Sequence, residues 1–279
     1  MSVLLPPELQ REIFEIAMKL NHEDAEVKLN LNLVADHVHF WVDHAFYRVV
    51  EISDSDSAAI FLTLVNSKPQ NFFATAVKVL LLMSSLRTTE MQIAQILHAC
   101  RGVESLAFWA PDYNSPLPLL VGKLPLRRLS LEFPNLVNTL GESTLPVWLS
   151  GLTHLDLAWE LRVKVSDLSG TLQQLTGLTH IALDGRLSQA AHARAVTESC
   201  PALQVLLIVE AEEEGEGVFQ SGEITKAYSF DHRIVLVFRE PPSIARDWVA
   251  PYFGLDDMWA SAEHVIAERL KKARTKVVE

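Results

Sequence analysis

Residues 152–157 read LTHLDL, and residues 178–183, 26 positions further on, read LTHIAL. The same pattern, apolar-x-x-apolar-x-apolar, occurs at six places, beginning at residues 77, 103, 126, 152, 178 and 203. Successive copies are therefore 23 to 26 residues apart. Because apolar and variable residues alternate at the end of each copy, the pattern predicts six short strands, each with one buried side.

Helical sequence lies between the copies. Residues 88–100 and 188–199 carry apolar side chains three and four positions apart, as amphipathic helices do. A repeat of one strand and one helix, with a period of about 20–29 residues, is typical of leucine-rich repeats. The predicted fold class is therefore α/β, a leucine-rich-repeat solenoid of about six degenerate repeats with its parallel strands on a concave face. A doubly wound parallel sheet also alternates strands and helices and is the alternative.

The two ends of the chain depart from the repeat. Residues 6–17, 29–50 and 58–65 have helical patterns, which predicts a helical module over residues 1–70. The solenoid is predicted over 71–240, including an acidic run at 210–216 and a last strand at 234–238. Residues 241–279 are predicted to form a C-terminal cap, with a helix over 256–272, because a solenoid needs atypical ends to cover its core.

Charge and composition limit the function. The chain has 279 residues and a net charge of −11, which argues against binding to nucleic acid or to an anionic membrane surface. Its N-terminus lacks the features of a signal peptide, and no apolar run reaches the length of a membrane span. Only Cys100 and Cys200 are present, and we expect both to be packed free thiols. These features together predict a cytoplasmic or nuclear protein.

No motif for catalysis or for cofactor binding is present, so we expect neither an enzyme nor a cofactor. His39 and Asp43 lie four residues apart and would share one side of a helix, as metal ligands could. Trp41 and Val42 already define the buried side of that helix. We therefore interpret the His-Asp pair as part of a polar surface and predict no metal site.

The N-terminal residues resemble a known family. Residues 5–9 read LPPEL and are followed by Ile13 and Phe14, which is similar to the opening of an F-box. Residues 31–50 resemble the second half of the F-box-like segment found in mushroom-forming (basidiomycete) fungi, and residues 254–263, GLDDMWASAE, resemble the closing motif of the same proteins. The order of these motifs is similar to that of a lineage-expanded family, in which an F-box-like segment is joined to degenerate leucine-rich repeats.

This resemblance implies a function: the substrate-recognition subunit of a cullin ubiquitin ligase, binding a Skp-type adaptor through the module and an unknown protein substrate through the repeats. The residues that would contact the adaptor are Leu5, Pro6, Leu9, Ile13, Phe14, Leu33, Val34 and Val38. Three alternatives remain. The module could be only the N-terminal cap of the solenoid, the chain could be an interaction scaffold without a ligase, or it could be a small-molecule-binding or enzymatic derivative that uses His154 and His180.

The predicted substrate surface is the concave face. Side chains that flank the inner leucines point away from the repeat core, and in the middle repeats these are polar and of both charges. The candidate contact residues are Trp109, Arg128, Glu132, His154, Asp156, His180 and Asp184. Trp109 would be an aromatic anchor and Arg128 a clamp for a carboxylate. His154 and His180 occupy equivalent positions, so we expect them to be neighbours about 5 Å apart. An ordinary solvated sheet surface is the alternative.

Overall fold

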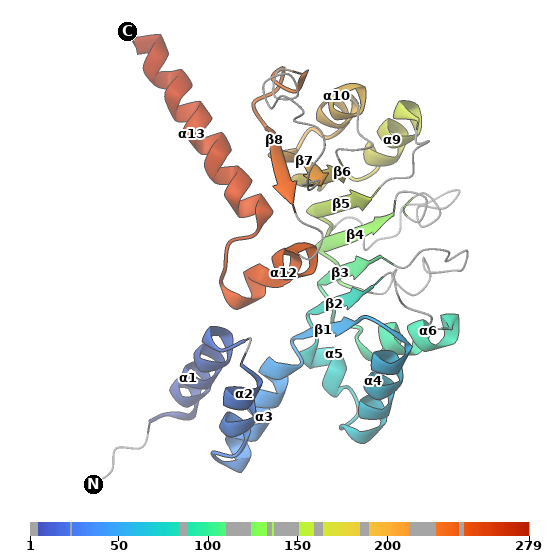
Figure 1. Cartoon of the computed structure of the whole chain (residues 1–279), viewed down its shortest axis with the longest axis vertical. Helices are drawn as coiled ribbons and strands as arrows, with labels where there is room; N and C mark the ends of the chain where they lie inside the picture. The colour runs from blue at the N-terminus through green and yellow to red at the C-terminus, as the bar shows by residue number, and fades with distance from the viewer. Residues whose placement is uncertain are drawn as a thin grey trace.

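The computed structural model describes residues 5–22, 24–83, 89–109, 124–132, 136, 151–158, 164–184, 190–211, 227–239 and 243–278. Its centre is one open sheet of eight parallel strands, which lie side by side in the order of the chain (Figure 1). The strands are β1 (Val49–Ile52), β2 (Val79–Leu82), β3 (Ser105–Phe108), β4 (Arg128–Glu132), β5 (His154–Ala158), β6 (His180–Asp184), β7 (Val205–Ala211) and β8 (Ile234–Arg239). The six predicted strands and the predicted last strand all form.

Helices lie on both sides of this sheet. On one side are α4 (Ser55–Ser67), α5 (Phe72–Ala76), α6 (Glu90–Ala99), α9 (Val165–Leu172) and α10 (Ala190–Ser199). On the other side are α12 (Ser243–Val249), the 3-10 helix η2 (Ala250–Phe253) and α13 (Met258–Val278), as Figure 1 shows. The helical module, α1 (Pro7–Leu20), α2 (Ala25–Asn32) and α3 (Asp36–Phe46), lies beside the β1 end. No helix in the described ranges is both long and apolar enough to cross a membrane.

The alternation along each strand gives the sheet two different faces. The leucine face carries the inner apolar residues of the repeats, which pack with α4, α5, α6, α9 and α10 into one buried cluster that includes Leu80, Leu106, Leu129, Leu155, Ile181 and Leu206. Equivalent residues pair across the strands, as Leu129 does with Leu155 and Leu155 with Ile181. The register predicted from the repeat is therefore confirmed, and the side chains between the leucines point to the opposite face.

Two helices on the leucine side begin with capping boxes. The Asp54 side chain accepts a hydrogen bond from the backbone of Ser57 at the start of α4. Thr89 and Gln92 exchange the equivalent hydrogen bonds at the start of α6. Because these bonds satisfy backbone groups that a helix leaves unpaired, they fix where each helix begins after its strand.

The start of the sheet differs from the sequence prediction. The helix predicted over 29–50 is two helices, α2 and α3, and the last residues of that range begin β1. Val49 and Val50 continue the apolar pattern of the helix, but they pair in parallel with Val79 and Leu80 of β2. The sheet thus begins inside the range that the sequence assigned to the helical module.

Candidate binding face

The histidine face is the sheet surface opposite the leucine face, and it includes Arg128, Ser130, His154, Asp156 and His180. His154 lies directly across from Arg128 on one side and from His180 on the other, which confirms the predicted neighbours. The two imidazole rings are stacked, with centroids 4.2 Å apart and planes 5° from parallel.

The Thr-His dipeptide repeated at residues 153–154 and 179–180 explains why the rings match. In each copy the threonine hydroxyl lies 2.8 Å from Nδ1 of the following histidine. Each hydroxyl also donates to a backbone carbonyl of the preceding repeat, Arg127 for Thr153 and Thr153 for Thr179. Identical local contacts in adjacent repeats place the two rings in the same orientation.

A second polar row crosses the same face. The Trp109 indole N–H donates to Ser130 Oγ at 2.6 Å, and the Ser130 hydroxyl donates to Asp156 Oδ2 at 2.8 Å. These three residues come from consecutive repeats. The predicted contact residues Trp109 and Asp156 are thus joined to each other through a serine that the sequence analysis did not single out.

The C-terminal segment, residues 243–278, covers the centre of the histidine face. Trp248, Met258, Trp259, Ala262 and Ile266 are buried in a cluster with apolar residues from β2, β3, β6, β7 and β8. The expectation of an open concave face is therefore wrong at this place. The segment also lies over a face rather than at an end of the sheet (Figure 1).

Arg128 shows how closely the segment fits. Its guanidinium carbon lies 4.9 Å from the ring centroids of both Trp248 and Trp259. Its Nη2 donates to Asp257 Oδ2 at 2.9 Å, and both side chains are buried. The other Asp257 oxygen accepts from the backbone N–H of Ala260 in the first turn of α13. Arg128 is thus a carboxylate clamp, as its residue type suggested, but its carboxylate belongs to the same chain.

Burial also determines the charge of the two histidines. It lowers the pKa of His154 to about 3, with smaller contributions in the same direction from His180 and Arg128. Burial lowers the pKa of His180 as well, while the hydrogen bond to Glu263 opposes that shift. Both rings are therefore neutral near pH 7. A base with a pKa near 3 has little power to remove a proton at that pH, which argues against general-base chemistry at His154.

The contact between His180 and Glu263 fixes a tautomer. His180 Nε2 lies 2.9 Å from Glu263 Oε1, and a carboxylate can only accept. In the neutral ring the proton therefore sits on Nε2 and Nδ1 is an acceptor, so the single proton of the Thr179 hydroxyl is shared between Nδ1 and the Thr153 carbonyl. Glu263 comes from α13, so Asp257, which pairs with Arg128, and Glu263, which pairs with His180, both belong to the C-terminal segment.

The other predicted contact residues lie near the border of this face. Glu132 and Asp184 are the last residues of β4 and β6, and both are partly exposed. Trp109, His154 and Asp156 are partly exposed too, whereas Arg128 and His180 are buried. The predicted anchor at Trp109 packs at the edge of the covered cluster. The set predicted as one open surface is therefore divided between a covered centre and a partly accessible border.

Four residues that close this site, Trp248, Asp257, Trp259 and Glu263, were not among the predicted contact residues, although three of them lie in the motif at 254–263. One signal for part of them was present. Asp257 lies at the start of the helix predicted over 256–272 and is followed by Met258 and Trp259, which is the pattern of a helix start with apolar residues to bury. Nothing in that pattern says which surface receives the tryptophans.

In the helical module, most of the predicted adaptor contacts are accessible. The side chains of Leu5, Leu9, Ile13, Leu33 and Val34 are exposed, as is Pro6, and Phe14 is half-buried. Val38 is different, because it is buried together with Met18 and Val42 between the helices of the module. Its predicted contact with an adaptor does not agree with this position.

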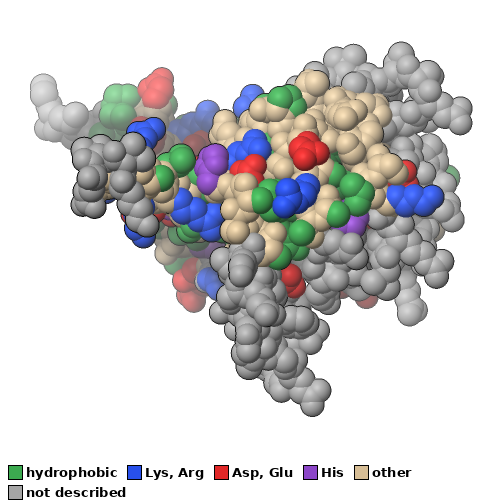
Figure 2. Space-filling view, turned by 90° about the horizontal axis from the view of Figure 1, so that it is seen from above, with side chains coloured by type: hydrophobic (Ala, Val, Ile, Leu, Met, Phe, Trp, Pro, Cys, Tyr) green, Lys and Arg blue, Asp and Glu red, His purple; other side chains and the backbone are tan. Residues whose placement is uncertain are grey.

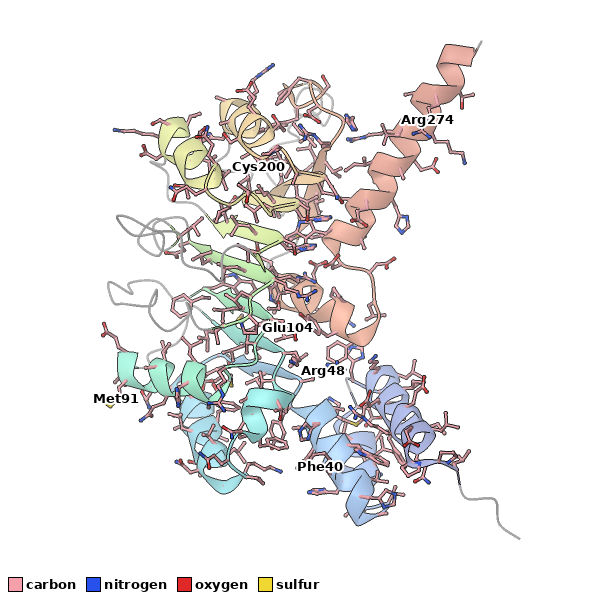
Figure 3. The ribbon with its side chains drawn as sticks, turned by 180° about the vertical axis from the view of Figure 1, so that it is seen from behind. Phe40, Arg48, Met91, Glu104, Cys200 and Arg274 are labelled. Atoms are coloured by element: carbon pink, nitrogen blue, oxygen red, sulfur yellow. The ribbon has the colours of Figure 1, made fainter. Side chains whose placement is uncertain are left out.

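The remaining sequence predictions concern thiols and metals. Cys100 and Cys200 are free and buried, as expected (Cys200 is labelled in Figure 3). Burial raises the pKa of Cys100 to about 12 and that of Cys200 to about 11, so both stay protonated thiols. Asp43 pairs with the Lys68 ammonium, and Asp43 Oδ2 also lies 3.6 Å from His39 Nε2. In the described parts of the chain, no group of three or more potential metal ligands is found.

No protein-family model matches this chain, and no curated protein matches it.

Proposed function

We propose that the chain is an F-box-like substrate-recognition subunit of a cullin ubiquitin ligase, with its sheet built as a leucine-rich-repeat solenoid. The helical module binds a Skp-type adaptor, and the sheet presents a protein substrate. The resemblance of residues 5–14, 31–50 and 254–263 to the fungal family supports this proposal, as does the stacking of strands at the repeat period.

The observation that carries the adaptor part is an apolar stripe along α1. Leu9, Ile13, Ile16 and Leu20 follow each other at four, three and four residues, so they share one side of the helix. They are 46%, 51%, 48% and 78% exposed. A soluble protein rarely leaves such a contiguous row uncovered unless another molecule binds it.

Two further features agree with this assignment. Leu33 and Val34, in the turn after α2, are 83% and 59% exposed and enlarge the apolar surface of the module. At the other end of the molecule, which Figure 2 shows from above, hydrophobic, basic and acidic side chains are interspersed among the coloured atoms. If the module were only a cap, Leu9 and Ile13 would be buried against the first repeat, and they are not.

The proposed substrate contact lies at a different place from the one predicted from the sequence. The centre of the histidine face is filled by the C-terminal segment, so the substrate contact is assigned to its border, where Trp109, Glu132, Asp156 and Asp184 keep part of their side chains accessible. The burial of His180 and the low pKa of His154 disfavour an enzymatic use of the two histidines.

The test is co-purification with a Skp-type adaptor from a mushroom-forming fungus. The wild-type chain should be captured, and the double variant Leu9→Asp/Ile13→Asp should lose capture while keeping its thermal unfolding transition. Ile60→Asp is the matched control, because Ile60 is a 63% exposed isoleucine on α4 and belongs to none of α1, α2 and α3. Failure of the wild type to bind, or equal capture of the double variant, would refute the proposal.

A further inference from the structure

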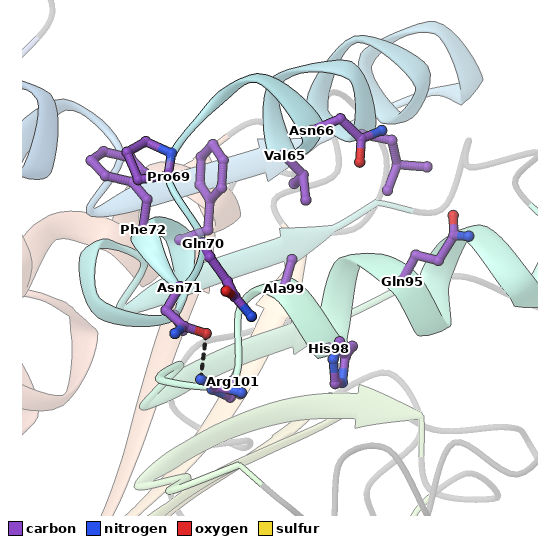
Figure 4. A pocket seen from close by; sticks show the side chains of 13 residues that line it. Val65, Asn66, Pro69, Gln70, Asn71, Phe72, Gln95, His98, Ala99 and Arg101 are labelled. Carbon is purple, nitrogen blue, oxygen red and sulfur yellow. Dashed lines mark hydrogen bonds between the residues drawn. The ribbon is translucent and has the colours of Figure 1, made fainter.

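A cavity opens between α4, α5 and α6, on the leucine side of the sheet and away from the histidine face. Its volume is about 390 Å³, within the range of about 300–1,000 Å³ that is usual for ligand sites. Figure 4 shows that side chains from the end of α4, from the connection to α5 and from α6 line it. No residue that the sequence analysis selected as a contact lies in it.

A close backbone contact fixes one wall of this cavity. A Cβ at Gly102 would lie 2.0 Å from the backbone oxygen of Ala74, so only glycine allows the end of α6 to approach α5 this closely. Arg101, immediately before it, is held at the mouth of the cavity as a result. The shape of the cavity thus depends on backbone packing and not only on exposed side chains.

The walls combine an apolar floor with a rim of amides. Val65, Phe73 and Ala99 supply the apolar part, and Gln70 and Gln95 lie on the rim. Neither amide has a hydrogen-bond partner within the described ranges. Because a side-chain amide both donates and accepts, it can pair with the N–H and C=O groups of a peptide backbone.

Arg101 gives the cavity its charge. Its Nη2 donates to Asn71 Oδ1 at 2.5 Å, shown as the dashed line in Figure 4. Asn71 has a φ of +68°, and it is the only non-glycine residue in the described ranges with a positive φ. Asparagine tolerates that left-handed conformation. The contact uses one of the five guanidinium N–H groups and limits how the side chain can rotate.

The cavity is also locally positive in an acidic protein. The chain carries a net charge of −11, yet none of the described residues that line the cavity is Asp or Glu. Arg101 has no carboxylate partner in the part of the chain that the structure describes. A planar guanidinium prefers a carboxylate, with which it forms two parallel, charge-assisted hydrogen bonds.

We propose that this cavity binds an extended peptide segment through an Asp or Glu side chain, with Arg101 holding the carboxylate, the floor taking a neighbouring apolar side chain and the rim amides pairing with the peptide backbone. This inference is independent of the ligase proposal, since binding requires no adaptor and is measured on the isolated chain. Loss of adaptor capture and loss of peptide binding are therefore separate results.

The experiment uses a panel of fluorescent octapeptides with blocked termini, each carrying one central Asp beside Leu, Ile or Phe and neutral residues elsewhere. Each has a counterpart with Asn in place of Asp. Fluorescence anisotropy should show binding of at least one Asp peptide, on the order of ten-fold tighter than its Asn counterpart, because a charge-assisted hydrogen bond distinguishes the two. No binding of any Asp peptide, or equal binding of the Asn counterparts, overturns the proposal.

Variants then test the residue. Arg101→Gln should abolish the difference between Asp and Asn peptides, whereas Arg274→Gln, which removes the same charge from exposed α13 (Arg274 in Figure 3), should preserve it. Asn71→Gly keeps the left-handed backbone but removes the contact to Arg101, so it should weaken Asp binding several-fold. An unchanged preference in Arg101→Gln, or equal losses in both arginine variants, contradicts the assignment. Protection of residues 66–74 and 95–101 from hydrogen exchange by saturating peptide should map the site, and protection elsewhere would refute it.

Discussion

The two faces of the sheet come from the same strands, yet they differ in how their buried surface is closed. On the leucine face the described helices pack against their own and neighbouring strands, so equivalent contacts recur after about 25 residues. On the histidine face the decisive contact joins Arg128 to Asp257, 129 residues apart. A periodic sequence therefore predicts the first face, while the second depends on a non-repeated segment returning across the sheet.

This difference between the two faces predicts that, of the substitutions considered, one at Arg128 lowers stability most. Arg128→Ala should lower the free energy of unfolding by about 3–5 kcal/mol, because it leaves the Asp257 carboxylate buried without its partner and empties the space between two indoles. Urea denaturation monitored by tryptophan fluorescence measures this loss. The exposed neighbour Arg127 is the control, and Arg127→Ala should change stability by less than about 0.5 kcal/mol.

A loss below about 1 kcal/mol for Arg128→Ala would mean that the C-terminal segment is not held on the face in solution. The comparison of the two faces would then fail, and the histidine face would return to being an open surface.

The contrast between the two faces also explains which parts of the structure can be predicted from the sequence. The leucine register, the parallel neighbours His154 and His180, and the helix starts at Asp54 and Thr89 are local or periodic, and such features can be identified in a sequence. The position of the C-terminal segment could not be predicted, because the indoles of Trp248 and Trp259 could be buried against many surfaces.

Residues at boundaries were also difficult. Val49 and Val50 fit the apolar pattern of the helix before them, and only pairing with β2 makes them a strand. The Arg101 cavity shows a third kind of limit. It depends on the approach of Gly102 to Ala74, which no residue pattern encodes in a recognisable form.

The second prediction concerns acid. The pKa of His154 is about 3 in the folded chain and near its ordinary value of 6.5 in the unfolded chain, so below pH 6.5 the unfolded state binds the proton more strongly. Stability is therefore lost as pH falls from about 6.5 towards 3. Between pH 7 and 4.5 the contribution of His154 should be about 2–3 kcal/mol. The pKa of His180 is lowered as well, so His180 adds to the loss of stability in acid.

Carboxylates also titrate in this range, so the informative quantity is the difference between two proteins. His154→Gln should have a flatter pH dependence than the wild type, measured by urea unfolding at intervals from pH 7 to 4.5. Parallel curves for the two proteins would show that His154 is not enclosed by the C-terminal segment, which would again break the distinction between the faces.

The smallest effect is expected on the leucine face. Ile181→Val removes one buried methylene and should cost about 1 kcal/mol, without changing the pH dependence, because the site is apolar. Ile181 lies two strands from Arg128, roughly 10 Å away at the spacing of neighbouring strands, and on the opposite side of the sheet. Sites so separated usually contribute independently, so the double variant with Arg128→Ala should lose the sum of the two single losses to within about 0.5 kcal/mol. A larger deviation would mean that loosening the C-terminal segment on the histidine face also changes the packing of the leucine face. The two faces would then act as one cooperative unit, and the local rule drawn from the leucine face would have to include residues more than a hundred positions away.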